Sequence, residues 1–147
     1  MSYQNILVPV DGSDISFSAL KQSFIIAKAF GSKVTAISVV ADDPFIAADF
    51  YYSPDMLKDY IEEAVKNAEE TLSKAKKLAE QDGIQIDTQV VRDTVSAETI
   101  IKTADSLKTN LIVMGSHGRK GFQKFLLGSF AQDVLGQTQL PVLIVKQ

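Results

Sequence analysis

The sequence predicts an α/β fold in which a five-stranded parallel sheet is flanked by helices on both faces. Short apolar runs alternate along the chain with longer segments whose apolar residues recur every three or four positions, as alternating strands and helices require. The runs at residues 6–10 and 111–114 contain no charged or polar residue, which is typical of parallel strands covered on both faces. The 147 residues, 46% of them hydrophobic, suffice for one domain, residues 1–147, with a sizeable core.

The first half of the chain predicts two strands and two helices. We expect a strand over residues 6–10, a helix over 14–30, a strand over 34–40 and a helix over 54–82. Ser13 or Asp14 can cap the first helix, and Gly31 is a typical residue at its C-terminal end. Pro54 suits the first turn of the second helix, and Gly83 ends it.

The second half predicts three strands and two shorter helices. We expect a strand over residues 84–91, a helix after Ser96 that reaches about residue 107, a strand over 111–114, a helix from Ser129 to about Gln137 and a strand over 142–145. Residues 84–91 alternate between apolar and polar side chains, which favours a position at or near an edge of the sheet. Ser96 is a suitable helix cap, and Pro141 introduces the last strand.

The long helix carries one apolar stripe. Its members recur at steps of three and four: Leu57, Ile61, Ala64, Ala68, Leu72, Ala75 and Ala79. Because alanine fills many of these positions, we expect a face packed on the sheet, not a coiled coil.

Composition excludes several classes of function. A formal net charge of −3 and a pI near 5.1 argue against a nucleic-acid partner. With no cysteine and one histidine, the chain has no disulfide, no thiolate metal site and no multi-histidine centre. No basic segment precedes the first apolar run and no long apolar stretch lacks charge, so we expect no signal peptide and no membrane span. A cytoplasmic location fits this composition.

A glycine-rich segment follows the strand at 111–114 and precedes the last helix. Gly115, Gly118 and Gly128 let backbone N–H groups approach an anion, and Ser129 adds a hydroxyl and free amides at a helix N-terminus. The segment matches neither the P-loop pattern GxxxxGK[ST] nor the dinucleotide pattern GxGxxG. Its position between strand and helix predicts a phosphate-binding loop.

Positive charges gather in the same segment. Arg119, Lys120 and Lys124 place three cations within six residues, enough to neutralise a triphosphate. Arg119, next to Gly118, is the one we expect to contact a ligand, while the two lysines raise the local potential.

Asp11 follows the first strand and is expected near Gly115, because ligands of parallel sheets bind outside the carboxyl ends of strands where the strand order reverses. Its carboxylate could accept hydrogen bonds from ribose hydroxyls or an exocyclic amine, hold Mg²⁺ with the phosphates, or serve as an ordinary turn residue. No catalytic residue is expected: His117 lacks a carboxylate partner in sequence, and Ser129 is a cap and phosphate ligand, since no adjacent base activates it.

Three motifs together resemble the universal stress protein family. They are Ile6-Leu-Val-Pro-Val-Asp-Gly-Ser13, the GxxG-(nine residues)-GS pattern from Gly115 to Ser129, and the terminal Pro141-Val-Leu-Ile-Val-Lys146. The glycine pattern is similar to the ATP-binding branch, and the resemblance implies a Rossmann-like fold of the adenine nucleotide α-hydrolase-like type.

The resemblance also implies roles for individual residues. Pro9, Val10 and Asp11 would contact the adenosine half, and Val39 would meet the adenine through its backbone. The ribose and phosphates would be contacted by Met114, Gly115, Gly118, Arg119, Gly128, Ser129 and Phe130.

Two features concern partners. The segment at residues 45–52 is aromatic, with Phe45, Phe50, Tyr51 and Tyr52, and the family is variable there, so its role as a cover for the nucleotide or a contact for a partner stays open. Family members commonly form homodimers through the last strand, which would otherwise be an exposed apolar edge.

The leading hypothesis is therefore an ATP-binding regulatory protein of the stress response, in which nucleotide occupancy acts as a conformational switch. A slow ATPase or adenylating activity with metal at Asp11 is the alternative from the enzyme class. A dimeric scaffold with a purely structural glycine loop is the third hypothesis. The sequence does not separate ATP from AMP or a cyclic nucleotide.

Overall fold

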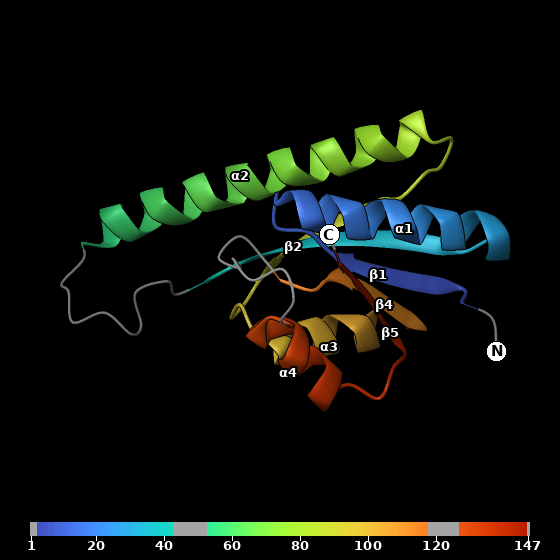
Figure 1. The fold of residues 1–147 in the computed structure, drawn as a ribbon. Helices are drawn as coiled ribbons and strands as arrows, with labels where there is room; N and C mark the ends of the chain where they lie inside the picture. Colours follow the sequence, from blue (N-terminus) through green and yellow to red (C-terminus); the bar gives the residue numbers. More distant parts are fainter. Residues whose placement is uncertain (1–2, 43–52, 118–126, 147) are drawn as a thin grey trace.

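The computed structural model describes residues 3–42, 53–117 and 127–146, and these form alternating strands and helices (Figure 1). In chain order the elements are β1 (Asn5–Pro9), α1 (Asp14–Phe30), β2 (Lys33–Val40), α2 (Pro54–Gln81), β3 (Asp87–Arg92), α3 (Ala97–Ser106), β4 (Leu111–Gly115), α4 (Ser129–Gln137) and β5 (Val142–Val145). Every expected element is present, with boundaries that differ by a few residues at most.

The five strands form one parallel sheet in the order β3-β2-β1-β4-β5, which confirms the predicted fold class. β1 is the central strand: Ile6 lies opposite Val34 of β2 on one side and Leu111 of β4 on the other. The chain builds outward from β1 to β3 and then returns to the opposite side of β1 to add β4 and β5. The strand order therefore reverses between β1 and β4, where such sheets bind ligands.

Helices cover both faces of the sheet, as Figure 1 shows: α1 and α2 lie on one face, and α3 and α4 lie on the other. Successive side chains of β1 alternate between the two cores. Ile6 and Val8 pack in the core that α1 and α2 cover, whereas Leu7 packs in the core that α3 and α4 cover. This two-sided burial explains why the strand sequence has no polar interruption.

Serine side chains cap three of the helices. Ser13, Ser53 and Ser96 accept hydrogen bonds from backbone N–H groups in the first turns of α1, α2 and α3. At the other end of α1, Gly31 adopts a left-handed conformation (φ 69°), as expected for a helix stop.

The strand expected at residues 84–91 pairs only from Asp87 onward. The N–H of Ile84 still bonds to the carbonyl of Ala79, so the chain is leaving α2 there and joins β2 only when Asp87 lies opposite Thr35. β3 does lie at an edge of the sheet, as its alternating pattern predicts.

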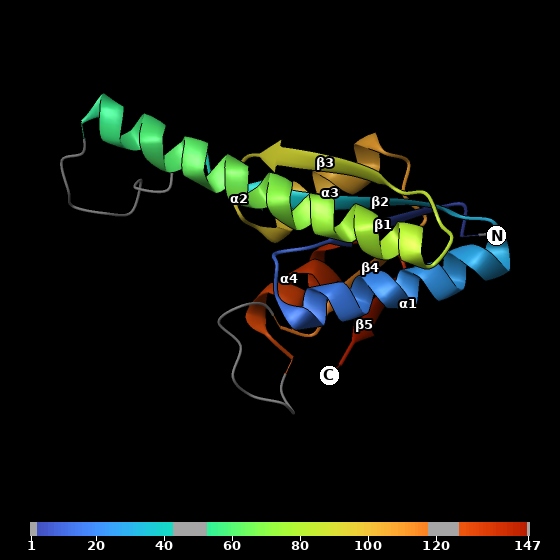
Figure 2. The ribbon, with the colours of Figure 1, turned by 90° about the horizontal axis from the view of Figure 1, so that it is seen from above.

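The apolar stripe of α2 packs on the sheet only in its second half. Buried residues begin at Ala68 and continue with Leu72, Ala75 and Ala79, whereas Leu57 and Ile61 are half-buried. Figure 2 shows why: the first half of α2 runs on past the end of the sheet. The expectation that the whole stripe is a sheet-packing face is wrong for these first turns.

This difference predicts unequal costs of truncation along α2. Leu72→Ala should lower the free energy of unfolding by about 2–5 kcal/mol, because it opens a cavity in the core. Leu57→Ala should cost about 1 kcal/mol or less, because much of its side chain already meets solvent. Urea denaturation of the two variants checks this, and equal losses would contradict the described placement of α2.

Candidate functional site

A cavity of about 800 Å³ opens at the carboxyl ends of the central strands. Nine of the eleven residues that the sequence predicts as site residues line it: Pro9, Val10, Asp11, Val39, Met114, Gly115, Gly128, Ser129 and Phe130. The other two, Gly118 and Arg119, lie outside the described residues, as do Lys120, Lys124 and the aromatic segment at 45–52. The fold thus gathers residues that are more than 100 positions apart in sequence around one space.

Asp11 forms the turn between β1 and α1 and also borders the cavity. Its Oδ1 accepts hydrogen bonds from the backbone N–H of Ser13, at 2.9 Å, and from the Ser13 hydroxyl. Gly12 adopts φ 86° in this turn, a left-handed conformation that favours glycine. The turn role and the cavity position, which are alternatives in sequence, coexist in the structure.

Ser116, the residue after β4, holds the two ends of the glycine-rich segment together. Its N–H donates to the carbonyl of Val145 in β5 at 2.9 Å, and its carbonyl accepts from the N–H of Gly128 at 2.7 Å. The Ser116 hydroxyl lies 3.1 Å from Nδ1 of His117. The N-terminus of α4 is therefore fixed beside the end of β4.

The same contact gives Gly128 an internal reason to be glycine. A Cβ at this position would lie 3.0 Å from the carbonyl oxygen of Ser116 and 3.2 Å from Cα of His117. These are backbone atoms that cannot turn away as a side-chain end can. Close approach of two protein segments, and not only the approach of an anion, requires the missing side chain.

α4 differs from the other helices at its N-terminus. Its cap residue is Gly128, which makes no side-chain hydrogen bond, and Ser129 is the first helical residue. The expectation that Ser129 is the cap is therefore wrong. The first turns of α1, α2 and α3 each contain an acidic residue beside their serine caps, whereas the first turn of α4 contains none.

This arrangement favours an anion. The first N–H groups of a helix have no intrahelical partner and carry the positive end of the helix dipole. In α1, α2 and α3 the chain's own oxygen atoms supply part of the compensating charge. At α4 the first turn borders the cavity at Ser129, Phe130 and Ala131, so a bound anion can supply it.

Sequence reasoning missed part of the cavity wall. Five residues of α2 border the cavity, together with Val95, which precedes α3: Tyr60, Ala64, Asn67, Ala68 and Thr71. Tyr60, Ala64, Asn67 and Thr71 are spaced by four, three and four positions. The spacing is that of one helix face, so the signal was present in sequence. Ala64 and Ala68 belong to the apolar stripe, and the other positions lie beside it, so the sequence predicted packing on the sheet alone.

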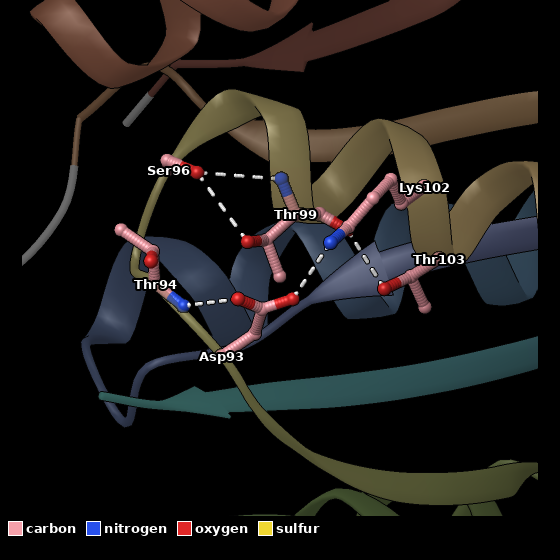
Figure 3. A network of polar contacts seen from close by, with 6 residues as sticks. All are labelled: Asp93, Thr94, Ser96, Thr99, Lys102 and Thr103. Atoms are coloured by element: carbon pink, nitrogen blue, oxygen red, sulfur yellow. Dashed lines mark hydrogen bonds and ion pairs between the residues drawn. The ribbon is translucent and has the colours of Figure 1, made fainter. Parts of the chain in front are cut away.

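A polar network fixes the loop that carries Val95, as Figure 3 shows. Asp93 accepts from the N–H of Thr94 at 2.7 Å and from Nζ of Lys102 at 2.9 Å, and its own N–H donates to the carbonyl of Val40. The hydrogen bond from Lys102 lowers the pKa of the Asp93 carboxyl, and the same bond raises the pKa of Lys102. The loop is thereby tied both to the end of β2 and to α3.

Together, a parallel sheet with a reversed strand order and a cavity at that reversal define a doubly wound α/β protein whose cavity lies at the carboxyl ends of its strands, where such folds bind ligands. The family model of the universal stress protein family matches residues 2–146, and the chain belongs to this family.

Comparisons with known proteins agree. The chain is 39% identical over 145 residues to universal stress protein MJ0531 of Methanocaldococcus jannaschii. The matched region covers 99% of this chain and 83% of that protein. The structure is similar to a universal stress protein in complex with cAMP (28% identity, TM-score 0.71, 99% of this chain and 98% of that one). It is also similar to the universal stress protein from Archaeoglobus fulgidus in complex with dAMP (25% identity, TM-score 0.71, 99% and 100%).

Among the described residues, no helix is both long and apolar enough to cross a membrane. Nor do these residues contain a group of three or more His, Cys, Asp or Glu side chains that could hold a metal ion unaided.

Two glycine substitutions, one at the cap of α4 and one within it, should change the free energy of unfolding in opposite directions. Gly128→Ala should lower the free energy of unfolding by about 1–3 kcal/mol, because the added methyl meets fixed backbone atoms. Gly136→Ala, in α4, should raise it by about 0.5–1 kcal/mol, since nothing lies within 4 Å of a Cβ there and alanine favours the helix. Thermal and urea unfolding measure both, and a stable Gly128→Ala protein would contradict the close approach.

Proposed function

We propose that the cavity binds an adenine nucleotide, ATP with Mg²⁺ foremost, and that occupancy acts as a conformational switch through which the protein regulates partners in the stress response. The observation that carries the proposal is the first turn of α4, which has neither a side-chain cap nor an acidic residue and faces the cavity. Two similar proteins whose structures hold cAMP and dAMP support an adenine nucleotide as the ligand.

The two ends of the cavity suit the two ends of a nucleotide. The phosphates lie at Gly115, Ser129 and Phe130, where backbone N–H groups and the dipole of α4 stabilise negative charge. The resemblance adds Gly118 and Arg119 to this end. The adenosine half lies toward Pro9, Val10 and Val39, at the ends of β1 and β2. A micromolar dissociation constant corresponds to about 8 kcal/mol, within reach of several charge-assisted contacts and burial of the base.

Asp11 fits Mg²⁺ only in company with phosphate. It is the one carboxylate among the described residues that line the cavity, and one of its oxygens already accepts from Ser13. Asp11 would hold Mg²⁺ together with phosphate oxygens and water, the ligands that this cation takes at nucleotides. The ion would neutralise part of the phosphate charge.

Binding, not hydrolysis, is the proposed activity. His117 is the one histidine of the chain, and its Nδ1 lies beside the hydroxyl of Ser116. A general base in a hydrolase must lie within hydrogen-bond reach of the water that it activates and is commonly oriented by a carboxylate, whereas the partner given for this imidazole is a hydroxyl.

We also propose that two copies pair along β5. This strand is the last in the order of the sheet, and Leu143 is 37% exposed. Pairing would remove an apolar edge.

Light scattering at micromolar concentration should give the mass of a dimer. Leu143→Lys should give a monomer that keeps its helical circular dichroism, because a charge on an edge strand blocks pairing without disturbing the core. A monomeric mass for the unchanged protein would exclude the dimer.

The anion site predicts that one substitution moves stability and affinity in opposite directions. Ser129→Asp places a carboxylate in the first turn of α4, so the free energy of unfolding should rise by about 0.3–1 kcal/mol. The same charge should repel the phosphates and weaken ATP binding at least about tenfold, with a far smaller effect on adenosine. Calorimetry with Mg²⁺ present and urea unfolding measure the two effects.

Ser73→Asp is the matched control, since Ser73 is an exposed residue of α2 that does not border the cavity. It changes the net charge equally and should leave ATP binding unchanged. Unchanged affinity in Ser129→Asp, or no heat of ATP binding to the unaltered protein, would reject the proposed function.

A further inference from the structure

One face of α2 forms a wall of the cavity. Tyr60, Ala64, Asn67 and Thr71 recur at the spacing of a single helix face, and all four border the cavity. Figure 2 shows the course of α2 along the sheet and past its end, which brings this face over the carboxyl ends of the strands. The wall thus belongs to a helix that supplies none of the residues implied by the glycine pattern or the turn at Asp11.

Small side chains on this wall leave room for a ligand. Ala64 and Ala68 border the cavity on either side of Asn67 in sequence, and each extends only one carbon beyond the backbone. Beside Asn67 this wall is therefore formed by short side chains, which leaves room for a flat ring system.

Asn67 is exposed and makes no hydrogen bond to any of the described residues. Two other polar side chains of the cavity are engaged within the chain: the hydroxyl of Ser16 donates to the carbonyl of Ser13, and Nδ1 of His117 pairs with the hydroxyl of Ser116. Asparagine is also a poor residue for the interior of a helix, because its side chain competes for backbone hydrogen bonds. Among the described residues, the amide of Asn67 thus keeps both a donor and an acceptor without a partner, at a position that borders the cavity.

We propose that Asn67 selects the base of the bound nucleotide, with adenine preferred over guanine. Its amide NH₂ donates to N7 of adenine while its carbonyl oxygen accepts from the exocyclic N6 amine, a bidentate pair that matches the adjacent acceptor and donor at this edge of the base. At the same edge guanine presents two acceptors, N7 and O6, so the oxygen of Asn67 would face another acceptor. The inference rests on the proposed nucleotide site and concerns the part of the ligand farthest from the phosphates.

The test compares AMP and GMP by calorimetry for the unaltered protein, Asn67→Leu and Asn67→Asp. The unaltered protein should bind AMP at least about tenfold more tightly than GMP, as expected for one bidentate pair. Asn67→Leu, similar in size but without polar atoms, should lose about tenfold for AMP and change little for GMP. Asn67→Asp, which keeps the acceptor and removes the donor, should also lose the preference.

Ser73→Ala serves as the control on the same helix, because Ser73 is exposed and does not border the cavity. It should keep both affinities. Circular dichroism and unfolding midpoints of all variants verify that α2 is intact, as expected for substitutions of exposed residues.

Three results would overturn the inference while leaving the nucleotide site in place. They are equal affinity of the unaltered protein for AMP and GMP, an AMP preference retained in Asn67→Leu, and equal losses of affinity for AMP and GMP in Asn67→Leu. The last would place Asn67 against a part that the two share. If the unaltered protein bound neither nucleotide and no ATP, the proposed function itself would fail, so the two failures are distinguishable.

Discussion

Two backbone hydrogen bonds of Ser116 fix the geometry on which the site depends. One joins the residue after β4 to the end of β5, and the other joins it to Gly128 at the start of α4. Because Ser116 is buried, neither bond competes freely with water. Together they hold the N-terminus of α4 where the strand order reverses, and this is the place at which the sheet leaves space beside β1.

The four helices differ in how the chain compensates their first turns. In α1, α2 and α3 a serine side chain caps the first turn and an acidic residue lies in it, so the chain itself compensates part of the positive charge at these N-termini. α4 has a glycine at the corresponding position, where a Cβ would press on the backbone of Ser116 and His117. The steric constraint that positions α4 thus also leaves its first N–H groups open to a ligand.

Most of the fold could be predicted from sequence because its signals are local. Uninterrupted apolar runs indicate strands buried on both faces, and Ser96 and Gly31 mark helix ends by their own chemistry. The cap of α4 could not be predicted in this way. Ser129 has the better capping side chain, but the choice of Gly128 is decided by Ser116, a residue that meets it only in the folded protein.

Part of the cavity lining was also predictable from sequence. Asp11 and Gly115 follow strands whose ends must meet in a parallel sheet, so topology alone brings them together. Asn67 and Tyr60 could not be placed, because the length of α2 relative to the sheet decides whether its face meets a core or a cavity. The periodicity of apolar residues in a helix does not predict where the sheet beneath that helix ends.

The two halves of α2 are anchored to the rest of the protein to different degrees. From Ala68 onward the helix is anchored by buried side chains, whereas the turns around Tyr60 rest on few of them. Local unfolding costs the least free energy where few apolar contacts must be broken, so the turns around Tyr60 open more readily than the turns from Ala68 onward. A large molecule that enters the cavity can therefore displace the turns of α2 around Tyr60 without distorting the sheet.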